Sequence, residues 1–292
     1  MEQTIRRAAL LAGGNGVHTL FSLGEQELPL CVESIGYNTN QETLRRPEGY
    51  PYFHWLQTLE GEGEFELSGR RFTLPAGTGS LLFPGVPHTY GPIGGVRWST
   101  LYVTFSGSLA EVLLASLGIR HTDWFDWGAD APITDHLLMM TEHAHQQNDR
   151  SGLQASVQLY HFITLLKTYG QTGGRSSLFQ QLKQLNPLLQ WLDEHYGDPE
   201  IGLNDMAELL SMTPRYLNSL FRQAFGMTAY AYLIQLRIRK AKELMSRGER
   251  KSVKEIAILS GYRDTSHFIA AFGKTEGMTP EQFRRLHEIT PP

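Results

Sequence analysis

Two segments near the C-terminal end repeat one pattern, and they constrain the fold more than any other feature of the chain. They run over 203–222 and 253–272, so fifty residues separate their first positions. Each has a short apolar segment with a small residue, Ala207 or Ala257, then a turn, then a second amphipathic segment. This is the pattern of a helix-turn-helix, whose second helix enters the major groove of DNA. Two such units predict a protein that contacts DNA at two successive places.

The first unit carries its own helix signals. Thr213 is suited to cap the second helix, and Pro214 fits the first helical position because no N–H is needed there. Leu217, Leu220 and Phe221 share one face at i, i+3 and i+4. The opposite face carries the side chains that we expect to contact DNA: Arg215, Asn218, Ser219 and Arg222. Arginine can bind guanine and asparagine can bind adenine, each with two hydrogen bonds. Taken alone, the helix also fits an ordinary amphipathic surface helix.

The second unit repeats this logic with different residues. Ser252 and Glu255 form a capping-box pattern, which predicts a helix start at Val253. Gly261 is placed to make the turn, and Asp264 is placed to cap the second helix. The residues expected to face DNA are Thr265, Ser266 and His267. Residues 228–246 predict one long helix that joins the two units.

Local charge supports contact with phosphates. The whole chain has a net charge of −4, which argues against a histone-like polycation. From 213 to 254, however, ten Lys and Arg face two Glu. Binding to the DNA backbone requires local rather than global positive charge. A solvated connector helix is the alternative explanation for the same charges.

At this point the chain resembles the AraC/XylS family of bacterial transcription regulators, over about residues 185–287. The matching residues are Ala207, Tyr216, Leu217, Leu220, Phe221, Phe225, Gly226, Thr228, Tyr232, Leu233, Arg237, Ala241, Ile256, Ala257, Gly261, Tyr262, Asp264, Phe268, Phe272, Gly277, Pro280, Phe283 and Arg284. The resemblance implies two recognition helices in adjacent major grooves. Ala270 and Gly273 stand where the family often has arginine and lysine. We therefore expect the second recognition helix to contribute less affinity or specificity for DNA.

The front half predicts an antiparallel barrel. Between 17 and 107, short alternating runs at 54–59, 64–67, 71–74 and 100–105 are separated by glycine-rich turns. The spacing of Gly61, Gly63, Gly77 and Pro87 is similar to the cupin barrel of the sugar-sensing members of the same family. The predicted fold class is therefore α+β with two domains. A cupin-type jelly roll with added helices precedes an all-α domain with two helix-turn-helix units.

The resemblance also implies an effector site inside the barrel. Arg46 keeps the spacing to Gly49 and Gly61 found in the arabinose-responsive members, although Thr100 and Tyr102 replace the rings those members carry. The residues expected to bind the effector are Arg46, His88, Tyr90, Trp98, Thr100 and Tyr102. A sugar needs an aromatic face for its C–H surface and polar groups for its hydroxyls. Simple core filling is the alternative role for Trp98 and Tyr102.

Metal catalysis has little support in the sequence. Metal-dependent cupins carry a His-x-His pair, whereas His54 is followed by Trp55 and Leu56, and only His88 stands at the later ligand position. Because a metal site needs three or more convergent ligands, we expect no metal, no cofactor and no catalytic residue. The alternatives are a cupin enzyme with a DNA-binding appendage and a barrel that serves only for dimerisation.

Helices are predicted at 109–117, 133–144 and 153–169, and the family resemblance implies that such helices pair two subunits. The expected domains are 1–169 for effector binding and dimerisation, 170–177 as a flexible linker, and 178–292 for DNA binding. A lone Cys31 suits a reducing compartment, and no stretch is apolar enough to span a membrane, so we expect a cytoplasmic protein. The sequence thus predicts an activator of carbohydrate-utilisation genes. Its expected partners are double-stranded DNA, a sugar-like effector, a second copy of itself and RNA polymerase.

Overall fold

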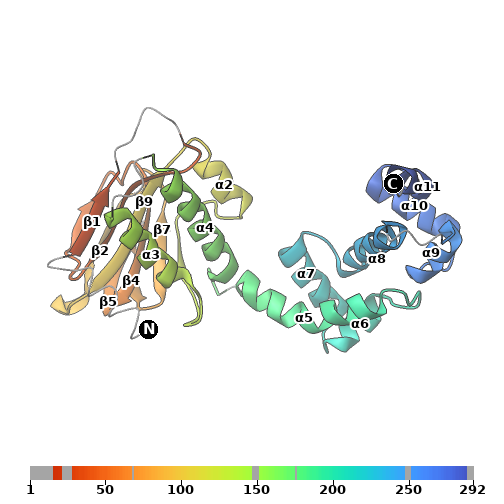
Figure 1. The fold of residues 1–292 in the computed structure, drawn as a ribbon. Coiled ribbons are helices and arrows are strands. Elements are labelled where there is room, and N and C mark those ends of the chain that lie inside the picture. Colours follow the sequence, from red (N-terminus) through yellow and green to blue (C-terminus); the bar gives the residue numbers. More distant parts are fainter. Residues whose placement is uncertain are drawn as a thin grey trace. The chain divides into compact units, whose positions relative to one another are not determined.

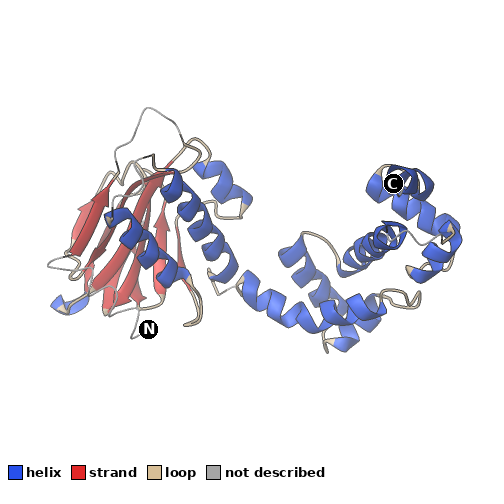
Figure 2. Ribbon diagram, in the orientation of Figure 1, coloured by secondary structure: helices blue, strands red, loops and turns tan. Residues whose placement is uncertain are grey.

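The computed structural model describes residues 16–21, 28–67, 69–146, 151–174, 176–246 and 251–287. The chain divides into two compact units, Met1–Phe179 and Gln180–Pro292. The first unit is built on β-sheets with helices added, and the second consists of helices (Figures 1 and 2). The predicted α+β fold class is confirmed. Within the described ranges, no helix has both the length and the apolar character needed to cross a membrane.

The first unit holds two antiparallel sheets. The larger has the strand order β1 (Gly16–Leu20), β2 (Cys31–Asn38), β9 (Ser99–Ser106), β4 (Phe53–Glu60), β7 (Thr78–Leu82) and β10 (Asp123–Asp126). The smaller has the order β3 (Leu44–Arg46), β8 (His88–Pro92), β5 (Glu62–Leu67) and β6 (Arg70–Pro75). A short 3-10 turn, η1 (Ile93–Gly95), follows β8. The strands predicted at 54–59, 64–67, 71–74 and 100–105 lie within β4, β5, β6 and β9.

Alternation along the strands divides the side chains between two cores. Successive residues of a strand point to opposite faces of its sheet. In β4, Phe53 and Trp55 therefore pack on the helix side of the large sheet, whereas Leu56 packs between the sheets with Phe65 and Tyr90. The even-numbered positions of β4 and β9 consequently face the interior of the jelly roll.

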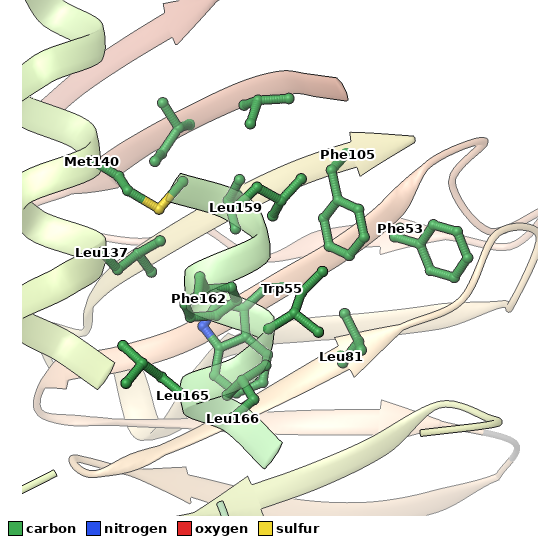
Figure 3. Packing of buried hydrophobic residues seen from close by; sticks show 14 of the residues in the cluster. Phe53, Trp55, Leu81, Phe105, Leu137, Met140, Leu159, Phe162, Leu165 and Leu166 are labelled. Atoms are coloured by element: carbon green, nitrogen blue, oxygen red, sulfur yellow. The ribbon is translucent and has the colours of Figure 1, made fainter. Parts of the chain in front are cut away.

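Three helices complete the first unit: α2 (Ala110–Ser116), α3 (Ile133–His145) and α4 (Leu153–Tyr169). Their apolar side chains join those of the large sheet in one buried cluster, in which the ring centroids of Trp55 and Phe162 are 5.4 Å apart (Figure 3). Burial of a large apolar side chain contributes roughly 1.5–3 kcal/mol. The helices therefore stabilise the large sheet by covering its outer face, and its inner face packs against the smaller sheet.

The start of the predicted linker is paired with the barrel. Gln171 and Asp126 exchange two backbone hydrogen bonds of 3.1 and 2.8 Å. Residue 175 lies outside the described residues, as does Ser68 of one predicted turn. The linker limits of 170–177 remain a prediction.

The second unit contains α5 (Leu178–His195), α6 (Leu203–Leu209), α7 (Pro214–Phe225), α8 (Ala229–Ser246), α9 (Val253–Leu259), α10 (Thr265–Glu276) and α11 (Pro280–His287). Its hydrophobic residues form two clusters. Leu233 and Leu236 of α8 belong to the cluster around Phe221, whereas Ile238 and Ala241 belong to the cluster around Phe268. One helix thus supplies both cores, as expected of a rigid connector.

The predicted helix caps form. Thr213 accepts a hydrogen bond of 3.2 Å from the backbone N–H of Tyr216. Ser252 accepts one of 3.2 Å from Glu255, whose carboxylate accepts one of 2.7 Å from the Ser252 N–H. Asp264 accepts from the backbone N–H groups that begin α10. These bonds fix where α7, α9 and α10 start.

The two turns differ in how they reach a left-handed backbone. Gly261 has φ +80°, and a Cβ built there would lie 2.4 Å from the carbonyl oxygen of Tyr196. Only glycine fits that conformation and that space. Ser211 occupies the equivalent turn of the first unit with φ +53°. The first turn therefore carries strain that the second avoids.

Arg237 lies beneath the second turn. Its side chain is 3% exposed, its Nε donates to the Tyr196 carbonyl at 2.9 Å, and its Nη2 donates to the Asp198 carbonyl at 2.7 Å. The guanidinium also lies 5.9 Å from the ring centroid of Tyr262. Burial lowers the pKa of Arg237 from its usual value. This arginine, counted above among the basic residues of 213–254, is therefore a structural group rather than a phosphate contact.

We expect Arg237→Ala to lower the free energy of unfolding by about 2–4 kcal/mol, because it removes a buried side chain and leaves two carbonyls without their charged donor. Arg239→Ala is the matched control, since Arg239 is 57% exposed and lies 3.8 Å from Asp193. Urea denaturation of the full chain, followed by far-ultraviolet circular dichroism, measures both. Equal losses in the two variants would contradict the bracing role.

Candidate DNA-binding surface and effector pocket

Helix α7 presents a charged face outside its core. Leu217, Leu220 and Phe221 are buried, whereas Arg215 and Arg222 are exposed. No hydrogen bond or ion pair of either guanidinium is found among the described residues, so both are available to a ligand. The polar face expected for a recognition helix is present.

Two of the predicted base-contacting residues already have partners in the protein. The amide oxygen of Asn218 accepts a hydrogen bond of 3.1 Å from the backbone N–H of Ala229, the first residue of α8. Ser219 accepts one of 3.2 Å from Gln223. A two-bond grip on adenine needs both the oxygen and the nitrogen of the Asn218 amide. In the absence of DNA the Asn218 oxygen fixes the start of the connector, and its contact with adenine stays a prediction that requires this bond to open.

Helix α10 offers a smaller and less charged face. Ser266 and His267 are exposed at its first turn, and Thr265 is half-buried. Farther along, Ala270 and Gly273 supply no polar group, and Ile269 is 39% exposed. An exposed apolar side chain can contact the methyl group of thymine. Ile269 is thus a candidate contact that the polar pattern alone did not reveal.

Some of the positive charge between 213 and 254 is used within the protein. Lys240 lies 3.3 Å from Asp193, and Lys242 lies 2.8 Å from Glu276. With Arg237 buried, the charge available to phosphates is smaller than the sequence count suggests. The exposed arginines of α7 therefore gain weight as DNA contacts.

Inside the jelly roll, strand register brings several polar rings together. Arg46 of β3 pairs with His88 of β8, and Tyr90 follows two residues later on the same face. His54 of β4 lies 6.3 Å from His88 and 6.2 Å from Tyr102 of β9, measured between ring centroids. Arg46, His88, Tyr90 and Tyr102 were predicted to converge here; His54 was missed as a member. Its signal was the alternation with Trp55, which sends His54 to the interior.

Three buried polar atoms of this cluster have no hydrogen-bond partner in the protein: Arg46 Nη1, His54 Nδ1 and His88 Nε2. His54 is 3% and His88 4% exposed. Nearly all buried polar atoms in folded proteins are paired, because an unpaired one costs about 1–3 kcal/mol. Three in one cluster mark a place where a ligand or solvent supplies the missing bonds.

The protonation states of the cluster follow from its burial. Burial, with smaller contributions from Arg46 and His88, lowers the pKa of His54 to about 3. Burial also lowers the pKa of His88 and raises those of Tyr90 and Tyr102 to about 12. At neutral pH both histidines are therefore uncharged and both phenols keep their protons. Arg46 is the cation of the group.

The tautomer of His88 can be assigned from its backbone contact. His88 Nδ1 lies 2.7 Å from the carbonyl oxygen of Val86. A carbonyl only accepts, so Nδ1 carries the hydrogen of the neutral ring. The unpartnered Nε2 is therefore a hydrogen-bond acceptor. It is suited to a hydroxyl group of a ligand.

Trp98 and Thr100 have hydrogen-bond partners within the protein. The indole N–H of Trp98 donates to Thr58 at 2.9 Å, and a Cβ on Gly63 would lie 2.4 Å from its ring. The Thr100 hydroxyl donates to Gln41 at 2.9 Å and accepts from Asn38 at 3.2 Å. Packing and hydrogen bonding within the protein thus engage both side chains, and their contact with the effector stays a prediction. Trp98 supports Tyr90 edge-on, with centroids 6.2 Å apart.

The described ranges contain no group of three or more His, Cys, Asp or Glu placed to hold a metal ion. A separate cavity of about 310 Å³ lies outside the jelly-roll interior, lined by residues of β2, α3 and α4 that include Ile35, Met140 and Ala155.

Models of known protein families match both parts of the chain. The model of the AraC-like ligand binding domain matches residues 31–163, and a helix-turn-helix domain model matches residues 206–286. The transcriptional activator RhaS of Shigella flexneri serotype 5b is 25% identical over 266 residues, covering 88% of this chain and 94% of its own. RhaS of Escherichia coli strain SE11 is 26% identical over 248 residues, covering 82% and 87%.

Among solved structures, the C-terminal domain of the response regulator AraT from Geobacillus stearothermophilus is 30% identical. It covers 37% of this chain and 91% of that one, with a TM-score of 0.35. A barrel of the ligand-binding type followed by two helix-turn-helix units defines a DNA-binding transcription regulator with its own sensor. The chain belongs to the AraC family, a family of transcription regulators and not of enzymes.

We expect acid to destabilise the barrel through His54. The pKa of His54 in the folded protein, about 3, lies below its ordinary value of 6.5. Below pH 6.5, His54 is therefore protonated in the unfolded chain but stays neutral in the folded protein. This contribution to stability is present above pH 6.5 and is lost as the pH falls toward 3, by up to about 1.4 kcal/mol per pH unit.

His54→Gln is expected to give a shallower loss of stability between about pH 7 and pH 5. His121→Gln is the control, because His121 is exposed. Urea denaturation at each pH measures the slope. A native slope that survives in His54→Gln would show that His54 is not held neutral.

Proposed function

We propose that this regulator is an activator of carbohydrate-utilisation genes that responds to a sugar-like small molecule bound inside the jelly roll. The observation that carries the proposal is the convergence of Arg46 Nη1, His54 Nδ1 and His88 Nε2, all buried and unpartnered. The name of the RhaS relatives, transcriptional activator, supports the direction of regulation. RNA polymerase remains a proposed partner on the same ground.

The chemistry of the cluster supports a polyhydroxylated ligand. Tyr90 and Tyr102 offer aromatic faces for the C–H surface of a sugar. Arg46 supplies fixed donors, and His88 Nε2 supplies an acceptor. A ligand hydroxyl can serve each of them, because a hydroxyl both donates and accepts. The site therefore pairs apolar faces with polar edges.

For DNA, we propose that α7 and α10 enter adjacent segments of the major groove, about ten base pairs apart. Their shared connector α8 supports this spacing, because it contributes to the cores of both units. Arg215 and Arg222 are the leading contacts in α7, and Ser266 and His267 in α10. Thr265 and Ser219 have secondary roles.

We further propose that α4 pairs two subunits. Leu153, Val157 and Tyr160 are 56%, 67% and 47% exposed, and their spacing places them on one stripe of the helix. An exposed apolar stripe on a surface helix is a common mark of a protein contact. The limits 1–169, 170–177 and 178–292 remain our proposed division, and we propose action in the cytoplasm, where the DNA is.

Arg215→Ala is expected to weaken specific DNA binding by about 1–3 kcal/mol and to relax preference at one base pair. The reason is that an arginine bound to a base edge carries sequence information. Titration of operator DNA at fixed salt, with each base of the site varied, measures both effects. Lys183→Ala, at an exposed position of α5 outside both helix-turn-helix units, removes the same charge and should leave base preference intact. An unaltered preference in Arg215→Ala would remove α7 from base reading.

His88→Ala is expected to abolish the effector response while basal DNA binding persists, because the residue lies in the other compact unit. A thermal-shift screen of the native chain with pentoses, hexoses and uronic acids identifies binders; a ligand at a hundred times its Kd contributes about 2.7 kcal/mol. Calorimetry and DNA titration then compare His88→Ala with the exposed-site control His121→Ala. Unchanged effector affinity in His88→Ala would place the site elsewhere.

Val157→Asp is expected to shift the chain toward monomer, because a carboxylate in an apolar contact must be desolvated. Sedimentation equilibrium over a range of concentrations measures the association constant, which should fall at least about tenfold if the change costs 1.4 kcal/mol or more. Gln154→Asp adds the same charge to an exposed position off the stripe and should associate like the native chain. Equal association of all three would exclude α4 as the contact.

A further inference from the structure

The charged and polar side chains in the cluster of Arg46, His54, His88, Tyr90 and Tyr102 differ in how many of their hydrogen-bonding atoms have a partner in the protein. Arg46 makes one contact of note, with the ring of Tyr50, whose centroid lies 3.7 Å from the guanidinium carbon. Its Nη1 is buried without a hydrogen bond, and no ion pair joins it to a carboxylate among the described residues. A guanidinium in such a place is stabilised best by an anion, since its fork of N–H groups matches a carboxylate.

Glu33, the acid hydrogen-bonded to Tyr50, already has several partners. Glu33 accepts hydrogen bonds from Ser34 at 2.8 Å, from the Tyr50 hydroxyl at 3.3 Å, and from Thr104. The hydroxyl of Tyr50 thus donates to Glu33, while the guanidinium of Arg46 lies over the Tyr50 ring. These three donors hold the Glu33 carboxylate, and among the described residues no ion pair joins it to Arg46.

The other groups facing Arg46 are neutral. His54 and His88 are uncharged at neutral pH, and Tyr90 keeps its proton. None of them compensates the positive charge, and none adds a second one. The cluster therefore offers a single cation, with an acceptor at His88 Nε2 and aromatic faces at Tyr90 and Tyr102 beside it.

From this arrangement we infer that the effector is a sugar acid, a polyhydroxylated molecule with one carboxylate that pairs with Arg46 while a hydroxyl donates to His88. The inference rests on the proposed function and specifies its ligand class. A neutral sugar can satisfy the hydrogen bonds but brings no counter-ion to the half-buried guanidinium of Arg46. A phosphate monoester brings up to two negative charges to one cation, so it fits less well.

His54 is a further polar group of this arrangement, expected to bind a ligand hydroxyl whether or not the ligand carries a carboxylate. Its ring lies within 6.0–6.3 Å of the rings of Tyr50, His88, Tyr90 and Tyr102. Its Nδ1 has no partner in the protein. It therefore stands beside both the cation and the acceptor, where a neutral group contacts a ligand hydroxyl without competing for the carboxylate.

The test compares matched pairs of probes on the full chain by calorimetry at constant ionic strength: D-galacturonate with D-galactose, and D-glucuronate with D-glucose. D-Glucose 6-phosphate separates carboxylate from phosphate recognition. We expect a uronate to bind at least about tenfold more tightly than its neutral partner, and the phosphate to bind less tightly than the uronate.

Arg46→Gln should bring the ratio of the two affinities close to one, and Arg46→Lys should keep part of it. Arg45→Gln removes a neighbouring charge from the exposed side of the same strand and should keep the ratio intact. Circular dichroism confirms that each variant folds. His54→Phe should weaken binding of both members of a pair.

The outcomes separate the two levels of the proposal. Binding of a neutral sugar equal to or tighter than its uronate, tighter binding of the phosphate, or an acid preference that survives Arg46→Gln overturns the sugar-acid inference and leaves the sugar-responsive regulator standing. Failure of every probe to bind the native chain overturns the inference as well as the proposed sugar response.

Discussion

The guanidinium of Arg237 connects parts of the helical unit that are distant along the chain. From the middle of α8 it donates to the carbonyls of Tyr196 and Asp198, which follow α5, and it lies against Tyr262 in the second turn. Gly261 leaves the space that the guanidinium occupies, since a Cβ there would lie 2.7 Å from Arg237 Nε. The position of the second helix-turn-helix on the connector depends on this arrangement.

A second arginine shows the opposite state. Arg237 has carbonyl partners for its buried donors, whereas Arg46 has a buried Nη1 with none. Burial of a charge is tolerated when geometry and hydrogen bonds compensate it. Compensation within the protein makes Arg237 a brace. Because Arg46 Nη1 has no such partner within the protein, Arg46 is the leading candidate for contact with a ligand.

The exposed faces of α7 and α10 differ in charge. Helix α7 exposes two arginines, while α10 exposes short side chains, a histidine and Ile269. Arginine gives the strongest common contact to guanine, and apolar groups read only the thymine methyl. We therefore expect the first unit to supply most of the charge-dependent affinity and the second to refine the choice of site.

Much of this protein is determined by the sequence itself. Cap residues, helical periodicity and glycine positions act over a few residues, so they predicted the limits of α4 and α8, the caps at Thr213, Ser252 and Asp264, and the turn at Gly261. Alternation along strands likewise predicted the barrel. Which partner each polar group finds depends on residues far apart in the chain, and only the tertiary structure decided it. Asn218 is hydrogen-bonded to Ala229, Thr100 to Gln41 and Arg237 to Tyr196. The Nδ1 atom of His54 has no hydrogen-bond partner among the residues of the neighbouring strands. Sequence periodicity shows which face a side chain occupies, but satisfaction of its hydrogen bonds depends on what the fold places opposite it.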